Sequence, residues 1–380
     1  MVQVQPPPPP EPPEFSRQFL SEFDTSNNHQ HTGGSRMNDT SEKVTPSILD
    51  RSRIVLAHGG GGQLTDQLIS EVILPRLGNE TLNELDDAAI LNGNIAMTID
   101  SYVVDPWQFP GGDIGKLAVC GTVNDLSVSG AKPLGIALSL ILTEGFAKRD
   151  LETILDSIGE SAAEADVKIV TGDTKVIPGS GIFITTAGVG LRDPAVKLAS
   201  RYIRPGDKII INRPIAEHGL TVMLAREMPD MQSVLKTDAS PLNGLIDLLL
   251  KQVPGEDVRF LRDATRSGIA GVTTDIATNT GYHVMLHEPD IPVDAHVQHA
   301  ADMLGLDVLE VANEGVVVAV VSPDVADQAV AVMRQHPYGR QACVIGEVQN
   351  NRDGICEITT MIGGHRIVHK PYGEQLPRIC

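Results

Sequence analysis

Aromatic residues are scarce in this chain of 380 residues, at 3% of the total. The hydrophobic fraction of 41% must therefore build its cores mainly from Val, Ile, Leu and Ala. That fraction is large enough for real cores, and the length leaves room for two domains of ordinary size.

Cysteine is also rare, with four residues at Cys120, Cys343, Cys356 and Cys380. None belongs to a CxxC pair, which argues against a disulfide framework. The distribution is typical of reduced thiols in a cytoplasmic protein, and we interpret Cys120 as a small buried thiol rather than a nucleophile.

Basic residues are fewer than acidic ones, with 30 Lys and Arg against 49 Asp and Glu, which gives a net charge of −19. Nucleic-acid binding needs a basic face, so the balance argues against nucleic acid and against anionic membrane surfaces. No apolar run reaches the roughly 18 residues that a membrane helix needs. The first residues show no basic and apolar signal pattern, so no membrane association is expected.

Residues 1–45 have too little apolar surface for a folded core. Prolines occupy positions 6–10, and Ser, Asn, His and Gly dominate up to Ser35. We predict a disordered Pro/Ser/Asn-rich extension, because burial cannot offset its ordering entropy. The sequence leaves open whether Met1 or Met37 is the start.

The most informative stretch is residues 98–133, TIDSYVVDPWQFPGGDIGKLAVCGTVNDLSVSGAKP. An apolar run over 95–99 predicts a buried strand that delivers Asp100 to a loop. A Pro/Gly-rich loop then precedes a helix from Ile114 to about 126–129, with Asp125 near its end. Such a helix start offers N–H groups to anions, and Mg²⁺ accepts a few carboxylates beside phosphate oxygens. The stretch predicts a magnesium–phosphate site, with a solvated Asp in a polar turn as the alternative.

Other acidic residues are also expected at the ends of elements. Asp86 and Asp87 stand at the mouth of a strand, and Asp173 follows a strand over 167–171. Four such positions favour one shared cation site over independent surface loops. The run His58–Gly62 precedes a helical pattern and can wrap phosphates closely, with a flexible hinge as the alternative. It is not a Walker A loop, because no GKS or GKT follows.

The order of strands and helices predicts an α/β (α+β) protein with two domains. We expect an N-terminal domain over 50–195, a C-terminal domain over 200–350 and a terminal region over 351–380. The boundary falls near 193–201, before the apolar strand 208–211.

Six segments resemble the HypE family of hydrogenase maturation factors: LAHGGGG, the block 98–133, IVTGDTKV, LRDATRSG, ANEG and the terminal PRIC. The resemblance runs from about Val55 to Cys380. A wider group with the same fold contains aminoimidazole ribonucleotide synthetase, selenophosphate synthetase and thiamine-phosphate kinase. It implies a two-domain PurM-like ATP-binding fold, a dimer formed by pairing of the N-terminal sheets, and a mobile C-terminal tail.

The resemblance also implies a reaction. A carbamoyl group arrives on Cys380 from the partner HypF, ATP drives dehydration of the thiocarboxamide to a thiocyanate, and the cyanide passes to iron on the HypC–HypD complex. Two rivals remain at this point. A PurM-like phosphotransferase or synthetase acting on a free small molecule has no use for a terminal cysteine. A non-catalytic ligand-relay scaffold has no need of the Asp cluster.

By resemblance, the metal positions are Asp87, Asp100, Asp125 and Asp173. The ATP-binding positions are Gly59, Gly60, Gly61, Gly62, Asp86, Lys116, Asn124 and Thr174. The catalytic and tunnel-lining positions are Cys380, Lys175, Glu314, Arg262, Asp263 and Arg266. Lys175 and Glu314 handle the thiocarboxamide and its protons.

Two further expectations concern the tail and one departure from the family. The span from Ile367 to Cys380 reaches roughly 45 Å if extended, so the thiol can face a partner and then withdraw beside Lys175 and Glu314. Ser267 stands where the family usually has Gly. If its φ is positive, the serine is strained.

Overall fold

The computed structural model describes residues 53–231, 233–373 and 378–380. The extension expected over residues 1–45 lies outside this part and stays a prediction. In the described part, no helix combines the length and the apolar character needed to cross a bilayer.

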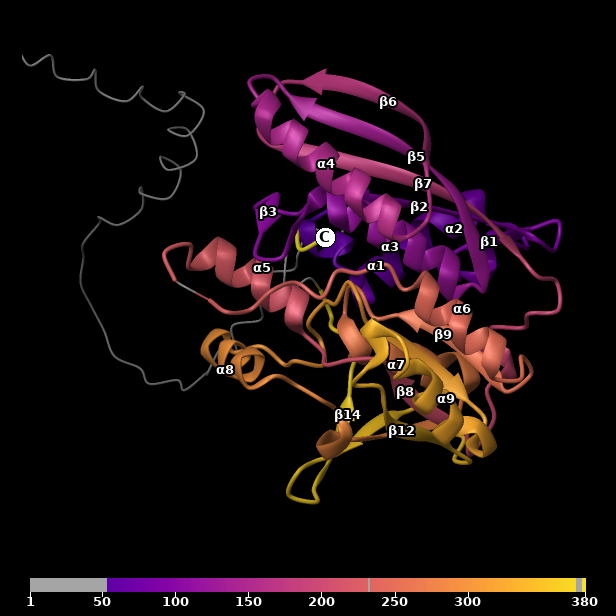
Figure 1. Cartoon of the computed structure of the whole chain (residues 1–380). Helices are drawn as coiled ribbons and strands as arrows, with labels where there is room; N and C mark the ends of the chain where they lie inside the picture. The colour runs from indigo at the N-terminus through magenta and orange to yellow at the C-terminus, as the bar shows by residue number, and fades with distance from the viewer. Residues whose placement is uncertain (1–52, 232, 374–377) are drawn as a thin grey trace, which may run out of the picture. The chain divides into compact units, whose positions relative to one another are not determined.

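A five-stranded sheet forms the first half of the fold (Figure 1). Its strands, in spatial order, are β1 (Ala89–Leu91), β2 (Ile95–Tyr102), β7 (Ile182–Arg192), β5 (Ala131–Thr143) and β6 (Ile169–Ile177). Neighbours are antiparallel except for the parallel pair β5 and β6. This places β6 at one edge of the sheet.

One face of this sheet is covered and the other is open. Helices α3 (Ile114–Val128) and α4 (Lys148–Glu164) pack on the covered face, where Ile136 and Ile184 join their core. The open face exposes Ile99 by 69% and Leu191 by 47%. Side chains alternate across a strand, so this open apolar face follows from the alternation along β2 and β7.

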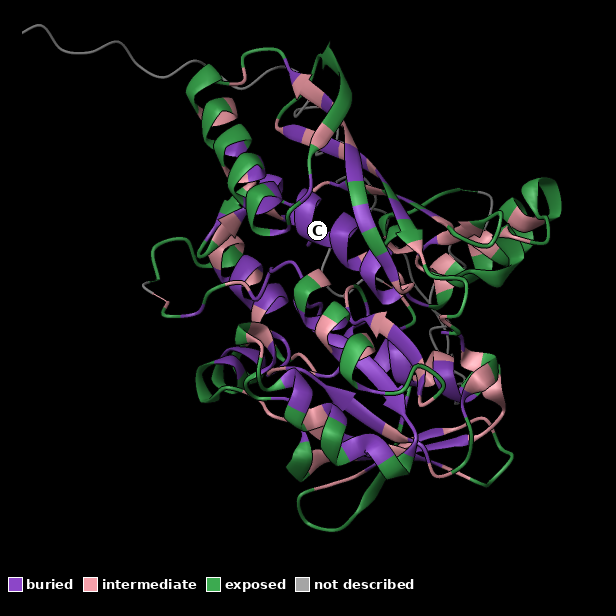
Figure 2. Cartoon of the chain, turned by 45° about the vertical axis from the view of Figure 1, so that its right-hand side comes forward, coloured by how far each residue is buried: buried purple, intermediate pink, exposed green. Residues whose placement is uncertain are grey.

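A seven-stranded sheet organises the second half (Figure 1). In spatial order it contains β14 (His365–Val368), β13 (Cys356–Thr359), β10 (His283–His287), β12 (Cys343–Gln349), β8 (Lys208–Ile211), β11 (Val317–Val321) and β9 (Val258–Asp263). Both faces are covered, so β11 is apolar throughout and β8 is apolar after Lys208, and the central strands appear buried in Figure 2.

The two faces of this sheet belong to two cores. Ile210 packs with α6 (Asn243–Gln252) and α9 (Ala326–Met333), whereas Ile209 and Ile211 pack on the side of α7 (Gly268–Thr280). Helices α5 (Glu217–Glu227) and α8 (Ala295–Leu304) pack against each other. Short elements complete the described chain: α1 (Gln63–Leu68), α2 (Leu74–Leu77), β3 (Gln108–Phe109) and β4 (Gly112–Asp113).

The α/β architecture and most predicted elements are confirmed, with local differences. Asp100 lies inside β2 rather than at its end, and Asp173 lies inside β6. Residues 54–57 enter a 3₁₀ turn, Leu56–Gly59, instead of a strand. Sequence reasoning missed α8 and the β13–β14 hairpin, because charged residues interrupt their apolar patterns.

Candidate active site

Carboxylates from three elements face one another where the first sheet and α3 meet β9. Asp100 projects from the covered face of β2, beside the buried Thr98 and Tyr102. Asp125 lies in the last turn of α3, and Asp263 ends β9. The negative charges of Asp263 and Asp100 raise the pKa of Asp125, and that of Asp100 also raises the pKa of Asp263.

Thr98 links two predicted metal positions. Its Oγ1 lies 2.7 Å from Asp125 Oδ2 and 3.0 Å from the backbone oxygen of Asp87. One hydroxyl hydrogen cannot serve two acceptors fully. A protonated Asp125 that donates to Thr98, while Thr98 donates to Asp87, satisfies both contacts.

Burial and mutual repulsion make this cluster reluctant to ionise. Burial, followed by the charges of Asp263, Asp100 and Asp87, raises the pKa of Asp125 well above its ordinary value. Burial and the neighbouring carboxylates raise the pKa of Asp263 to about 8. The Asp263 Oδ2 atom is buried without a hydrogen-bond partner in the described structure. A cation placed among these groups would favour their charged forms.

Arg262 connects the cluster to the root of the C-terminal tail. Its guanidinium lies 3.3 Å from the Asp87 carboxylate and 3.5 Å from Asp275 in α7. Lys370 contacts Asp275 at 3.1 Å and Asp66 of α1 at 2.9 Å. One chain of opposite charges therefore runs from Asp87 through α7 and the tail root to α1, the helix after the predicted phosphate loop.

Glu314 sits in a turn that a second acidic residue holds in shape. The Asp238 carboxylate accepts hydrogen bonds from the backbone N–H groups of Glu314 and Gly315, both at 3.1 Å. A Cβ at position 315 would lie 2.1 Å from the Asp238 carbonyl oxygen, so glycine is required there. Burial first, then Asp238, Asp263 and Asp100, raises the pKa of Glu314 well above its ordinary value. The sequence carries no local signal for Asp238, which acts across 76 positions.

The glycine loop packs on the motif LRDATRSG. Gly61 has φ +73°, and a Cβ on it would meet Arg266 Cβ at 2.8 Å. Arg266 donates from its guanidinium to the Gly59 carbonyl oxygen at 2.7 Å. A Cβ on Gly62 would meet the Pro371 carbonyl oxygen at 2.4 Å. These close approaches account for Gly61 and Gly62, whereas a Cβ on Gly59 would meet nothing within 4 Å.

Ser267 adopts φ +64°, so the strained conformation anticipated at this position is present. Its hydroxyl is buried without a hydrogen-bond partner in the described structure. Ser267 therefore destabilises the start of α7 in two ways, through its positive φ and through its buried hydroxyl without a hydrogen bond.

Two predicted nucleotide contacts occupy other surroundings. Asn124 is buried and its amide is engaged by backbone groups: it donates to Ser240 and accepts from Leu242. It joins α3 to the second half of the chain, where these backbone groups occupy its amide.

Lys116 lines a cavity of about 420 Å³ between α3 and α4, together with Asp156 and Glu160. Asp86 is exposed beside Asp87.

The GDTK motif lies apart from the buried cluster, on the edge strand β6. Asp173, Thr174 and Lys175 are exposed there. Lys175 Nζ lies 2.5 Å from Asp173 Oδ2, and this contact lowers the pKa of Asp173. Within one chain, the described contacts pair these side chains only with each other.

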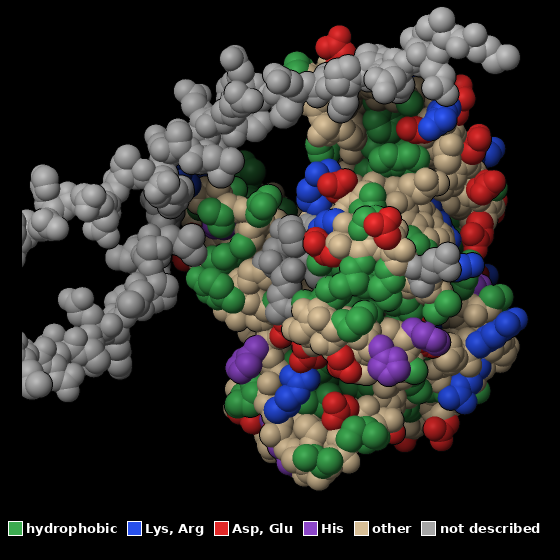
Figure 3. All heavy atoms as spheres, turned by 90° about the vertical axis from the view of Figure 1, so that its left-hand side faces the viewer, with side chains coloured by type: hydrophobic (Ala, Val, Ile, Leu, Met, Phe, Trp, Pro, Cys, Tyr) green, Lys and Arg blue, Asp and Glu red, His purple; other side chains and the backbone are tan. Residues whose placement is uncertain are grey.

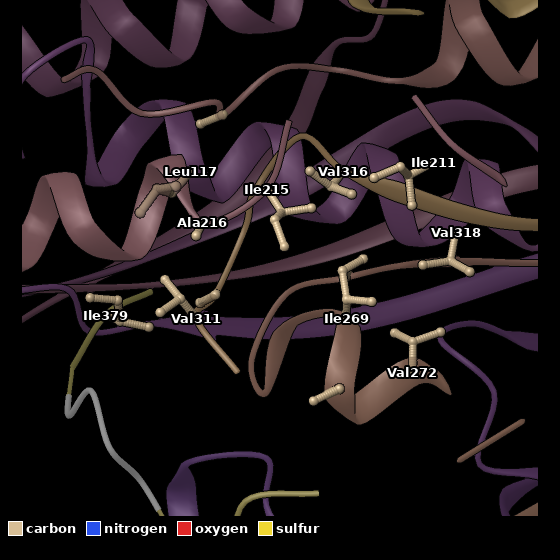
Figure 4. Close-up of a cluster of buried hydrophobic side chains, with 14 of the residues drawn as sticks. Leu117, Ile211, Ile215, Ala216, Ile269, Val272, Val311, Val316, Val318 and Ile379 are labelled. Atoms are coloured by element: carbon tan, nitrogen blue, oxygen red, sulfur yellow. The ribbon is translucent and has the colours of Figure 1, made fainter. Parts of the chain in front are cut away.

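The last residues are docked on the body of the protein. Val103 N–H donates to the Cys380 carbonyl oxygen at 2.9 Å, and Asp105 N–H donates to that of Arg378 at 3.2 Å. Ile379 is 3% exposed and lies in a cluster of buried aliphatic side chains that includes Val311 (Figure 4). Cys120 is fully buried and burial raises its pKa strongly, so its interpretation as an inert thiol is confirmed.

The donor set suits magnesium bound together with phosphate. Among the described residues, no group of three or more His, Cys, Asp or Glu side chains is placed so that it could hold a metal ion without other ligands. Mg²⁺ takes one or two carboxylates and fills its octahedron with water and phosphate oxygens. The buried Asp263 oxygen without a partner and the mutually repelling carboxylates fit such a cation. Figure 3 shows acidic and basic side chains interspersed on one described face, rather than gathered into a basic patch.

Comparisons with known proteins match this architecture. Residues 85–192 match the family "AIR synthase related protein, N-terminal domain", and residues 204–358 match its C-terminal counterpart. Carbamoyl dehydratase HypE of Cupriavidus necator is 42% identical over 342 residues, covering 88% of this chain and 97% of its own.

Two solved structures are also similar. A crystal structure of a HypE–HypF complex contains a chain with 44% identity and a TM-score of 0.76, covering 80% of this chain and 99% of that one. HypE in complex with ATP has 40% identity and a TM-score of 0.71, covering 86% and 100%.

Proposed function

The chain belongs to the HypE family and is an ATP-dependent carbamoyl dehydratase of hydrogenase maturation, and we propose that it dehydrates a carbamoyl group carried on its own Cys380. The observation that carries this proposal is the docked terminus. A cysteine at the end of a chain is ordinarily frayed and inert. Here the backbone of Cys380 is bound to the residue after β2, three positions beyond Asp100.

The chemistry requires activation of an amide oxygen, which is a poor leaving group. Transfer of the γ-phosphoryl group of ATP to that oxygen turns it into phosphate, a good leaving group. Loss of phosphate and of both N–H protons leaves the nitrile. The sum is thiocarboxamide and ATP giving thiocyanate, ADP and phosphate, and it needs a base and positive charge near the oxygen.

Glu314 is the proposed base for the amide protons. Burial raises its pKa above the ordinary value, which increases the affinity of the carboxylate for a proton. The Asp238 carboxylate orients it through the two backbone N–H groups of the turn. Arg266 supplies positive charge, since its guanidinium partly opposes the rise that burial causes in the pKa values of Asp100 and Glu314.

Asp87, Asp100 and Asp125 are the proposed holders of Mg²⁺, which would neutralise phosphate charge during transfer. Arg262 of β9 pairs with Asp87 in the described structure, so it would compete with the cation for this carboxylate. The same ion pair keeps the loop that carries Asp87 close to β9. Gly59, Gly60, Gly61 and Gly62 remain proposed phosphate neighbours by their resemblance to the family's glycine loop. In the described structure, the N–H groups of Gly60 and Gly61 donate to Ala57 O and Thr65 Oγ1.

A homodimer would bring Asp173, Thr174 and Lys175 of one chain to the site of the other. Their exposure on the edge strand and the open apolar face of the same sheet support this proposal. Lys175 would then hold the thiocarboxamide oxygen of the partner copy. A C₂ dimer repeats every such contact, so both sites would be completed alike.

HypF is the proposed carbamoyl donor, supported by the HypE–HypF complex of a relative. The HypC–HypD complex is the proposed cyanide acceptor, and the cytoplasm is the proposed location, consistent with four cysteines that form no disulfide. Handover to two partners requires the thiol to leave its docked position. We therefore retain an inward and an outward tail state in the proposal.

The test is the mass of the intact protein after incubation with carbamoyl phosphate, HypF and ATP. Cys380→Ala should eliminate the carbamoyl and cyano adducts while leaving nucleotide binding near wild type. Cys343→Ala, a change at a half-buried thiol, is the matched control and should keep both adducts. An adduct that persists in Cys380→Ala would refute the assignment.

A further inference from the structure

A buried histidine on α5 holds the docked tail. His218 lies in the first turn of α5 and is fully buried. Its Nε2 lies 2.9 Å from the Ile379 carbonyl oxygen, and its Nδ1 lies 2.8 Å from Thr237 Oγ1. Phe109 packs edge-on against the ring, with the ring centroids 5.5 Å apart.

The partners of this ring determine its tautomer. A carbonyl oxygen only accepts, so Nε2 must carry the hydrogen. Thr237 Oγ1 already accepts from Ala239 N–H at 3.0 Å, which leaves its own hydrogen for Nδ1. Burial lowers the pKa of His218, in agreement with a neutral ring. Both ring nitrogens are thus used, one on the tail and one on residue 237.

The same helix holds the tail at a second point. Arg226 donates to the Arg378 carbonyl oxygen at 2.7 Å and to the Asp105 carbonyl oxygen at 2.6 Å. Positions 218 and 226 share one helical face, because eight residues span about two turns. The three terminal carbonyl oxygens are accordingly bound by α5 and by the segment after β2.

The segment that orients His218 also orients the proposed base. Thr237 contacts His218, and the next residue, Asp238, binds the backbone of Glu314 and Gly315. Thr237 N–H is itself fixed by the Pro110 carbonyl oxygen at 3.0 Å. The adjacent residues Thr237 and Asp238 therefore act on two parts of the site. Thr237 positions the tail through His218, and Asp238 positions Glu314.

We propose that His218 is a positioning residue, which sets the register of the docked tail so that the modified Cys380 meets the site of dehydration. This inference rests on the proposed role of Cys380. Carbamoylation by an external partner needs the thiol outside, whereas dehydration needs it docked. Removing the Nε2 donor leaves the Ile379 carbonyl oxygen buried without a partner, which penalises only the docked state.

The experiment compares His218→Phe, His218→Gln and Thr237→Val in the full-length protein. Phenylalanine keeps the ring volume beside Phe109 without its nitrogens, and glutamine restores an N–H donor. For each variant, intact mass measures the fraction carbamoylated by HypF and the rate of water loss after ATP is added. Alkylation of Cys380, located by peptide mass, measures exposure of the thiol.

His218→Phe should carbamoylate to the wild-type extent and dehydrate roughly 10- to 100-fold more slowly, with faster Cys380 alkylation. His218→Gln should recover most of that rate, and Thr237→Val should show a smaller loss of the same kind. A wild-type dehydration rate in His218→Phe would overturn the inference. If that variant does not fold, an unchanged dehydration rate in Thr237→Val, or a low rate in His218→Gln, overturns it instead.

The Cys380→Ala result separates the two claims. If the carbamoyl adduct survives in Cys380→Ala, the proposed function itself fails. If Cys380 is the acceptor and the His218 variants dehydrate normally, only the positioning role fails.

Discussion

The acidic residues of this protein occupy two contrasting environments. Asp87, Asp125 and Asp263 lie where two sheets meet, and burial and repulsion raise the pKa values of Asp125 and Asp263. Asp173 lies exposed on the edge strand β6, where Lys175 lowers its pKa. In the first group, Arg262 pairs with Asp87, while burial disfavours the charged forms of Asp125 and Asp263. In the second region, Asp173 is paired with Lys175 and faces outward.

Under the proposed function, the difference separates charges that would serve a site within one chain from charges that would serve a neighbouring chain. A buried cluster with raised pKa values is typical of a functional site. An exposed ion pair contributes little to stability, so stability gives no reason for a GDTK motif on an edge strand. A second copy of the chain would explain the exposed motif, because it would convert that edge into part of an interface.

The largest expected effect is loss of ATP turnover. Asp87→Asn and Asp173→Asn should each lower dehydration by roughly a hundredfold or more, since each removes charge that positions phosphate in the transition state. Mixing equal amounts of the two inactive variants under conditions of subunit exchange should restore about a quarter of wild-type activity. About half of the dimers are then mixed, and each mixed dimer carries one intact site of two.

Single-turnover dehydration in the mixture measures this complementation. Two preparations of Asp87→Asn carrying different affinity tags provide the control and should regain nothing. If the mixture of Asp87→Asn and Asp173→Asn stays inactive while subunits exchange, the two aspartates act in one chain and the contrast between the regions is wrong.

A smaller effect concerns stability against pH in the absence of magnesium. The pKa of Asp263 is about 8 in the folded protein, against 3.8 ordinarily, so the folded state retains a proton that the unfolded chain has released. Stability should therefore fall as pH rises through the window between these values.

Scanning calorimetry in a chelator should show Tm decreasing by a few degrees from about pH 6 to about pH 8. Asp263→Asn should flatten that slope, whereas Asp173→Asn should leave it as in wild type, because its carboxylate is exposed. Equal slopes of Tm against pH in the wild type and in Asp263→Asn would show that the buried cluster does not cause the pH dependence of stability.

The smallest effect is at Ser267, next to the glycine loop. Ser267→Gly should raise the free energy of unfolding by about 1 kcal/mol, because glycine accepts a positive φ and removes a buried hydroxyl. Ser267→Ala removes the hydroxyl and keeps the strained backbone, so it should gain less. A denaturant melt in which alanine stabilises as much as glycine would exclude backbone strain as the cause.

Local patterns predicted much of the fold. The helix from Ile114, the apolar strands around residues 208–211 and 316–321, and the glycine loop before a helix could be read from spacing alone. The sequence also predicted that Asp87, Asp100 and Asp125 lie together, and their charges do interact in the structure. Their role as metal ligands stays a prediction. The same patterns misplaced Asp100 and Asp173 at strand ends, since apolar runs stop before the hydrogen-bonded strand does.

Long-range contacts could not be predicted in the same way. The amide of Asn124 looked suited to a ligand, and only the fold shows backbone groups of residues 240 and 242 using it. Asp238 and His218 sit in unremarkable sequence, and their partners lie 76 and 161 positions away.

The sequence by itself determined the family, the element types and the residue chemistry, because these depend on neighbours within a few positions. Only the tertiary structure decided which carboxylates share a low-dielectric junction, which lie on an edge, and how the terminus is held. Those outcomes depend on burial and on contacts between distant segments, and a pKa follows from both rather than from residue type.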